Sequence, residues 1–214
     1  LNKMISAGLD YLPLSFFDFI LHFTYLFIYN KSEIINRKKN TLYGSSCRSL
    51  FHTIIKKLLD KKDNQKILVS PIHHTSFRNI IELFFEPHNI TVLPMNKNYN
   101  KVLVTPEIAN NHYDICVISH LFGQDLDTSE LEKLQYKGNC LFIEDRVQGG
   151  EFKQKFSDML FDISLYSCGM DKKPCALGGG IMYARKNGLD IILEASEEIK
   201  TYKQETRLDR FLFI

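Results

Sequence analysis

Short apolar runs that alternate with segments of helical spacing constrain the fold of this 214-residue chain more than any other feature. A strand that is buried on both faces reads as a continuous apolar run, as in a parallel sheet covered by helices. The chain therefore predicts an α/β domain with a mostly parallel sheet. The runs are KILVS (66–70), ITVLP (90–94), DICVISH (114–120), CLFIED (140–145), DISLYS (162–167) and GIMYARK (180–186).

Three segments with helical spacing lie between or before these runs. SCRSLFHTIIKKLLD (46–60) has apolar residues on one helical face, with Ser45 or Ser46 as its N-cap. SFRNIIELFF (76–85) and TSELEKLQ (128–135) follow, the latter with Ser129 and Glu132 at the spacing of a capping box. Because ligands of parallel α/β sheets bind outside the carboxyl ends of the strands, polar residues at those ends are the first candidates for a site.

The amino-terminal segment, residues 1–40, differs from the rest. YLPLSFFDFILHFTYLFIY (11–29) approaches the length of a membrane span, about 20 residues, but Asp18 and His22 interrupt it. No small-residue cleavage pattern follows, so we expect no signal peptide. We expect an added helix that is buried or faces a partner, and no membrane anchor.

Charge and cysteine usage exclude several classes of function. The formal net charge is only +2 and the basic residues are scattered, which argues against a nucleic-acid partner. The five cysteines are odd in number and form no CxxC pair. This usage is typical of reduced thiols in the cytoplasm, and it predicts neither a disulfide framework nor a metal site.

Polar residues fall where a ligand of such a sheet would bind. Asp145 and Ser167 each end an apolar run, and His73 and His74 follow another after a Pro-Ile step. Residues 44–46, Gly-Ser-Ser, precede a helix start, which presents free amides to an anion. Taken singly, these residues have ordinary explanations as caps, turns and exposed loops.

Together with a lysine they match the needs of pyridoxal 5'-phosphate (PLP). In SLYSCGMDKKPCALGGGIMYARK (164–186), Lys172 and Lys173 lie between one predicted strand and a glycine-rich turn. A PLP site needs a lysine for the Schiff base, an acid for the pyridine nitrogen, a ring that stacks on the cofactor and donors for its phosphate.

Residues 41–186 resemble the large domain of the DegT/DnrJ/EryC1/StrS family of sugar aminotransferases, which are fold type I PLP enzymes. VISHLFGQDLDTSELEKL (117–134) is similar to the family's PVHLYGQ segment and its acid-rich helix start. LFIEDRVQGG (141–150) resembles IEDAAQ, and YSCGMDKKPCALGGG (166–180) resembles FSFxxxKxLxxxGxGG. The resemblance implies a three-layer α/β/α domain.

The resemblance also implies roles for single residues. In the family the Schiff-base lysine lies at a fixed distance after the strand-end serine and at a fixed distance before the glycine-rich turn. Applied to Ser167 and to the turn of this chain, both distances give Lys172, with Lys173 as the alternative. Ser167 would bind the phosphate, Asp145 would contact the pyridine nitrogen and Gln148 would lie near the ring hydroxyl.

Two segments depart from the family's pattern near the acid and the phosphate. GSSCRSL (44–50) resembles the phosphate segment SSGTAAL only loosely, and it assigns Ser46, Cys47 and Arg48 to the phosphate. Arg146 follows the acid at a position where the family has small residues, and this bulky cation would alter the substrate side.

The ring-stacking segment departs as well. PIHHTSF (71–77) replaces the family's PSFTF and resembles the histidine that stacks on PLP in cysteine desulfurases. His73 is the predicted stacking residue, and His74 is the alternative.

The resemblance predicts a PLP-dependent aminotransferase that moves an amino group from an amino acid to a keto-sugar nucleotide, and that works as a homodimer. Residues 41–214 would be the PLP-binding large domain alone, without the family's small carboxyl-terminal domain. Lys172 would be the general acid/base of the proton transfer. The alternatives are a cysteine desulfurase-like lyase and a catalytically silent scaffold with the same fold.

Overall fold

The computed structural model describes residues 35–36, 40–120, 122–135, 140–149, 160–168, 179–185 and 188–196. These residues all belong to one unit that begins at Ile35. The predicted helix within residues 1–40 and both candidate lysines, Lys172 and Lys173, lie outside the described residues, so these predictions remain untested.

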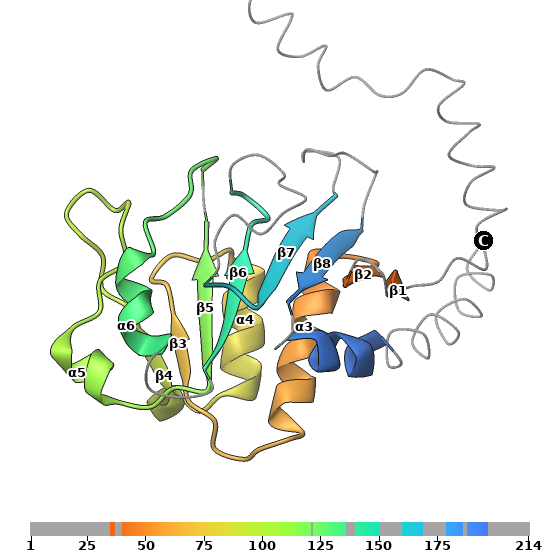
Figure 1. The fold of residues 1–214 in the computed structure, drawn as a ribbon, viewed down its shortest axis with the longest axis horizontal. Coiled ribbons are helices and arrows are strands. Elements are labelled where there is room, and N and C mark those ends of the chain that lie inside the picture. The colour runs from red at the N-terminus through yellow and green to blue at the C-terminus, as the bar shows by residue number, and fades with distance from the viewer. Residues whose placement is uncertain are drawn as a thin grey trace, which may run out of the picture. The chain divides into compact units, whose positions relative to one another are not determined.

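The described residues build one eight-stranded sheet with the order β1-β2-β8-β7-β6-β5-β3-β4 (Figure 1). The strands from β3 to β7 run parallel to one another, whereas β8 is antiparallel to both β7 and β2. The predicted mostly parallel sheet is confirmed. The strands are β1 (Ile35–Asn36), β2 (Thr41–Gly44), β3 (Ile67–Val69), β4 (Ile90–Val92), β5 (Ile115–Ser119), β6 (Leu141–Asp145), β7 (Ile163–Ser167) and β8 (Gly180–Ala184).

The order of the strands contains a switch point between β3 and β5. The chain passes from β3 to β4 on one side and then returns to place β5 on the other side of β3. From β5 it continues outward through β6 to β7. Connections diverge at such a point, and ligands of open α/β sheets bind there, outside the carboxyl ends of the strands.

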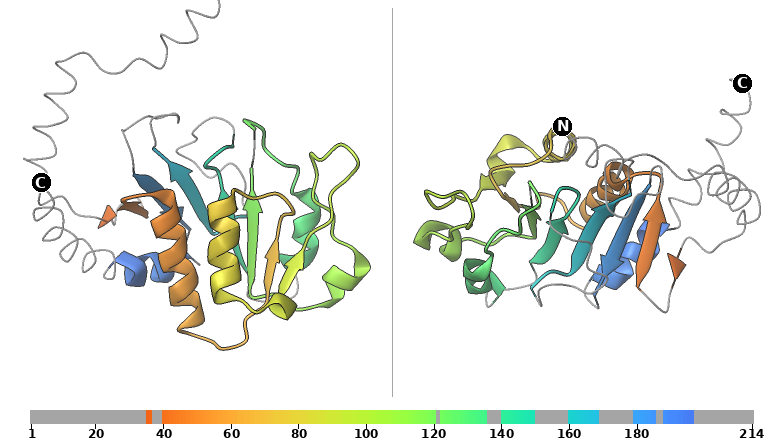
Figure 2. Two further views of the ribbon diagram at one scale, coloured as in Figure 1. Left: turned by 180° about the vertical axis from the view of Figure 1, so that it is seen from behind. Right: turned by 90° about the horizontal axis from the view of Figure 1, so that it is seen from above.

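Helices cover both faces of the sheet, which confirms the three-layer α/β/α fold. Figure 2 shows α3 and α4 side by side on one face, and Figure 1 shows α5 and α6 on the other. A further helix spans residues 188–196. The helices are α3 (Cys47–Leu59), α4 (Thr75–Phe84), η2 (Pro87–Asn89), α5 (Pro106–Asn110), η3 (Ser129–Leu131) and α6 (Glu132–Gln135).

Local signals explain where these helices begin. Ser46 caps α3, because its side chain accepts from the amide of Ser49 while its own amide donates to the Ser49 hydroxyl. The predicted capping box of Ser129 and Glu132 is wrong. The Asp127 carboxylate accepts from the Ser129 amide instead, and this segment begins as the 3-10 helix η3.

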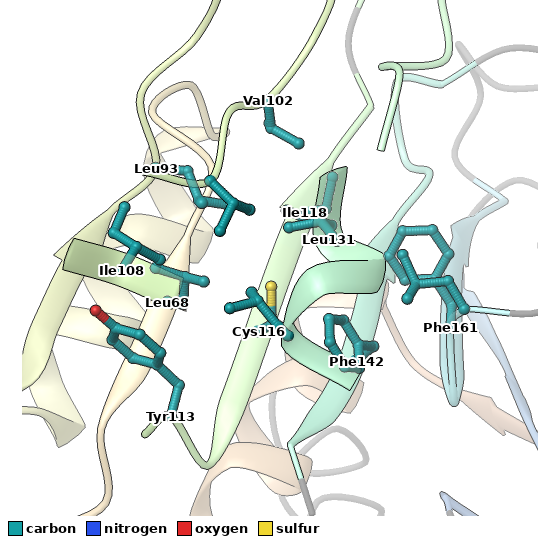
Figure 3. Packing of buried hydrophobic residues seen from close by; sticks show 13 residues of the cluster. Leu68, Leu93, Val102, Ile108, Tyr113, Cys116, Ile118, Leu131, Phe142 and Phe161 are labelled. Carbon is teal, nitrogen blue, oxygen red and sulfur yellow. The ribbon is translucent and has the colours of Figure 1, made fainter. Parts of the chain in front are cut away.

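The hydrophobic core on the α5–α6 side shows which side chains of the central strands point to that face. Leu68, Cys116, Ile118 and Phe142 pack there against residues of α5, η3 and α6, such as Leu131 (Figure 3). Successive side chains of a strand point to opposite faces. In β6, therefore, Glu144 points to the same face as Phe142, and Asp145, the last residue of the strand, points toward α3 and α4.

The described residues contain no helix that is both long enough and apolar enough to cross a bilayer.

Candidate functional site

The polar residues predicted from strand ends meet at the carboxyl edge of the sheet. Ser119 ends β5 and is paired in register with Asp145, which ends β6. Ser167 ends β7 opposite Gly180, and Gly180 is also paired with the last residue of β2, Gly44. Because α3 begins directly after β2, its amino terminus lies at the same edge.

Asp145 is a buried carboxylate at the centre of this edge, 2% exposed. Its Oδ2 accepts from the Ser119 hydroxyl at 3.0 Å and its Oδ1 accepts from the Val147 amide at 3.0 Å. Burial raises its pKa from 3.8 to about 6, although these hydrogen bonds and two nearby histidines favour the charged form. No lysine or arginine of the described chain forms an ion pair with it.

His73 lies beside this acid, whereas His74 does not contact it directly. The Nδ1 atom of His73 is 2.7 Å from the Ser119 hydroxyl oxygen, which in turn binds Asp145. Burial lowers the pKa of His73 to about 4, so its ring is neutral at neutral pH. His74 is exposed and caps α4, accepting from the Ser76 amide at 3.2 Å. The geometry favours His73 over His74 as the ring beside a ligand.

The predicted phosphate segment forms the first turn of α3. The Ser46 side chain is engaged as the N-cap, and the Arg48 side chain is exposed. Cys47 is buried, and burial together with the charge of Asp145 raises the pKa of its thiol well above the ordinary value. The thiol of Cys47 is therefore neutral at neutral pH. The first amides of a helix have no intrahelical acceptor, so this turn can offer amide donors to an anion.

β8 passes very close to this turn. A Cβ atom at Gly180 would lie 2.5 Å from the Cys47 nitrogen, and Gly179 has a φ of +97°. Gly180 therefore allows β8 to approach the first turn of α3, and Gly179 adopts a conformation that favours glycine. Ser167 is half-buried beside it, and Cys168 donates its amide to the Gly179 carbonyl at 3.0 Å.

Gln148 lies in the turn that follows β6 and is half-buried. Its backbone carbonyl accepts from the Gly123 amide at 2.9 Å, which joins this turn to the loop after β5. The predicted role of its side chain near a ring hydroxyl remains a prediction.

A second buried polar cluster occupies the opposite face of β6, and the sequence did not predict it. Glu144 is fully buried, and its carboxylate accepts a hydrogen bond from the Ser164 hydroxyl. The Nε2 atom of His120 lies 3.3 Å from Glu144 Oε2. Arg146 places Nη1 3.2 Å from Glu144 Oε2 and Nη2 2.6 Å from Asp125 Oδ1. The expectation that Arg146 alters the substrate side is wrong, because its side chain is buried in this cluster. A glutamate inside an apolar strand was the available signal, since a buried charge requires partners.

Several solved structures share the fold of this chain. The structure superposes on an aminotransferase from Psychrobacter cryohalolentis with a TM-score of 0.63 at 15% identity, covering 85% of this chain and 50% of that one. It superposes on the E. coli GDP-4-keto-6-deoxy-D-mannose-3-dehydratase with bound hydrated PLP with a TM-score of 0.61 at 12% identity, covering 85% and 52%. A Thermus thermophilus aspartate aminotransferase gives 0.54 at 10% identity, covering 76% and 46%. No protein-family model and no curated protein matches the sequence.

Identities this low show the fold alone. They confirm the predicted fold of the large domain of fold type I PLP-dependent transferases. The chain spans about half the length of the solved structures it matches. The narrower resemblance to the DegT/DnrJ/EryC1/StrS family stays a prediction.

Proposed function

We propose that this chain is the cofactor-binding part of a PLP-dependent aminotransferase. The observation that carries the proposal is the buried carboxylate of Asp145, which has no lysine or arginine partner among the described residues and lies at the carboxyl ends of the strands. With a pKa of about 6 it is mostly ionised at neutral pH. It therefore offers a negative charge to a ligand atom that carries a proton, such as a pyridine nitrogen.

The other residues of the edge fit the remaining parts of the same ligand. The neutral ring of His73 would lie against the pyridine ring, and Gln148 would face the ring hydroxyl. Ser167 and the first turn of α3, with Ser46, Cys47 and Arg48, would hold the phosphate through hydroxyl and amide donors. The resemblance of segment 166–180 assigns the covalent bond to Lys172.

PLP, when bound, supplies an electron sink that delocalises charge from the α-carbon of an amino acid. Asp145 maintains that capacity by keeping the pyridine nitrogen protonated. Lys172 would act at the α-carbon of the amino donor, first as the general base that accepts its proton and then as the general acid that gives the proton back to the bound reactants.

We further propose a keto-sugar nucleotide as the amino acceptor. This proposal rests on the three motifs that resemble sugar aminotransferases. Two similar structures support it, a GDP-4-keto-6-deoxymannose-3-dehydratase with bound GDP-perosamine and the E. coli dehydratase. The enzyme would act in the cytoplasm, and it would be a homodimer. A sedimentation measurement of the particle mass tests the homodimer directly.

Borohydride reduction of the purified full-length protein with PLP, followed by peptide mapping, tests the proposal. We expect a pyridoxyl group on Lys172 that is lost in Lys172→Arg and retained in the matched control Lys173→Arg. A label on Lys173 with Lys172 unmodified would reverse the assignment. A protein that retains no PLP would refute the enzyme and leave the silent scaffold. Product analysis with a keto-sugar nucleotide against cysteine separates the aminotransferase from a desulfurase-like lyase.

A further inference from the structure

Ser119 occupies a position between the two groups on which the proposed function depends. It is fully buried at the end of β5. Its hydroxyl oxygen is 3.0 Å from Asp145 Oδ2 and 2.7 Å from His73 Nδ1.

The hydrogen bonds around Ser119 allow only one direction of donation. A serine hydroxyl has one hydrogen, and an ionised carboxylate can only accept. Ser119 must therefore donate to Asp145, and it must accept from His73. The Nδ1 atom of His73 then carries the proton of the neutral ring, and the Nε2 atom is left as an acceptor.

The contacts on the other side of the ring agree with this direction. The Ser70 hydroxyl oxygen accepts from the Ser119 amide at 3.0 Å, which leaves its own hydrogen to donate. It lies 3.4 Å from His73 Nε2 and 3.4 Å from the Ile72 carbonyl, and both of these atoms are acceptors. Among these hydroxyl contacts each hydrogen has a single acceptor, so they agree with a proton on Nδ1 of His73.

We propose that Ser119 is a positioning residue that orients the Asp145 carboxylate and determines which ring nitrogen of His73 carries the proton. Its importance for a cofactor rests on the proposed function, whereas the hydrogen-bond arrangement itself does not. In this arrangement the Ser119 hydroxyl links the Asp145 carboxylate to the ring of His73 through two hydrogen bonds. The ring is held in a single orientation with its Nε2 atom as an acceptor.

Nitrogen-15 NMR of the full-length, cofactor-free protein at about pH 7.5 tests the arrangement, because protonated and unprotonated ring nitrogens resonate far apart. With the signals assigned through His73→Gln, we expect a proton on Nδ1 of His73 in the unmodified protein. Ser119→Ala removes the acceptor and should give a mixture of both tautomers. Ser119→Thr retains the hydroxyl and should restore the single form.

The adjacent histidine provides a matched control. Ser76 has its hydroxyl 2.8 Å from His74 Nδ1, so Ser76→Ala removes a serine contact from the neighbouring ring. We expect it to change the His74 signals and leave those of His73 unchanged. A proton on Nε2 of His73 in the unmodified protein overturns the proposal without any variant. Unchanged His73 signals in Ser119→Ala overturn it as well.

PLP binding separates this inference from the proposed function. Ser119→Ala should bind PLP about tenfold more weakly, as expected when one hydrogen bond to a charged group is lost, and Ser119→Thr should recover most of the affinity. Equal affinity in all three proteins overturns the positioning role. If none of them binds PLP, the proposed function fails, and the tautomer measured without cofactor still supports or overturns the hydrogen-bond arrangement.

Discussion

Replacing Arg146 by methionine tests how the fold carries the buried charge of Glu144. Arg146 is 4% exposed and pairs with Glu144 at 3.2 Å and with Asp125 at 2.6 Å. Methionine fills much of the same volume and carries no charge. The variant therefore removes the cation while it leaves most of the apolar packing in place.

The size of the effect follows from the burial of Glu144, which is 0% exposed. Burial works to raise its pKa, but contacts from His120 and Ser164 and the charge of Arg146 hold it below the ordinary value. Breaking a buried pair by removing one partner costs about 3–5 kcal/mol. For a chain of this length such a loss lowers the Tm by about 10 °C.

Urea unfolding of the cofactor-free protein at about pH 7.5, followed by circular dichroism, measures the loss as a shift in the midpoint at constant slope. Arg78→Met is the matched control, because Arg78 pairs with Glu82 at 2.7 Å with the two side chains 72% and 50% exposed. Such an exposed pair contributes about 0.5 kcal/mol or less. Glu144→Gln in the Arg146→Met background should recover part of the stability. If Arg146→Met loses no more stability than Arg78→Met, the buried charge of Glu144 does not depend on Arg146.

Two further predictions concern the candidate site. In Gly180→Ala the new Cβ would lie 2.5 Å from the Cys47 nitrogen and 2.7 Å from the Ser46 carbonyl carbon, so β8 or α3 must move. We expect a loss of about 1–3 kcal/mol in urea unfolding and weaker PLP binding, and wild-type values for both would contradict the close approach. For Asp145, a folded pKa of about 6 against about 3.9 in the unfolded chain means that its ionisation destabilises the folded state as pH rises from about 4 to above 6. Cofactor-free Asp145→Asn should thus be more stable than wild type at about pH 7.5, by up to about 3 kcal/mol, and should lose that advantage near pH 4; an advantage that grows on acidification would disprove this sign.

The sequence predicted the features that depend on local pattern. All six apolar runs contain strands of the sheet, because a strand that helices cover on both faces carries mainly apolar side chains. Ser46 is the N-cap of α3 for the same local reason, since its side chain serves the amide three residues later. Asp145 and Ser167 end parallel neighbours, so their meeting at one edge followed from the predicted parallel sheet.

Features that depend on contacts between distant segments could not be predicted. The short strand β2 has no apolar run of its own and exists because β8 pairs with it. Ser119 read as a strand residue, and its importance depends on the register that pairs it with Asp145, 26 residues later. The sequence predicted that Arg146 would lie on the substrate side. In the structure its guanidinium pairs with Asp125, in the loop after β5, and belongs to the cluster on the other face.

Glu144 and Asp145 are adjacent in sequence, yet the alternation of side chains along β6 gives them opposite roles. Glu144 points to the α5–α6 face, where the effect of burial is outweighed by His120, Ser164 and Arg146, which hold its pKa below the ordinary value. Asp145 points to the α3–α4 face, where burial raises its pKa and no lysine or arginine of the described chain pairs with it. Both acids are buried, so burial alone does not explain why the pKa of one is lowered and that of the other is raised. The two acids differ in whether a described residue supplies the opposite charge: Arg146 does so for Glu144, whereas no lysine or arginine of the described ranges forms an ion pair with Asp145.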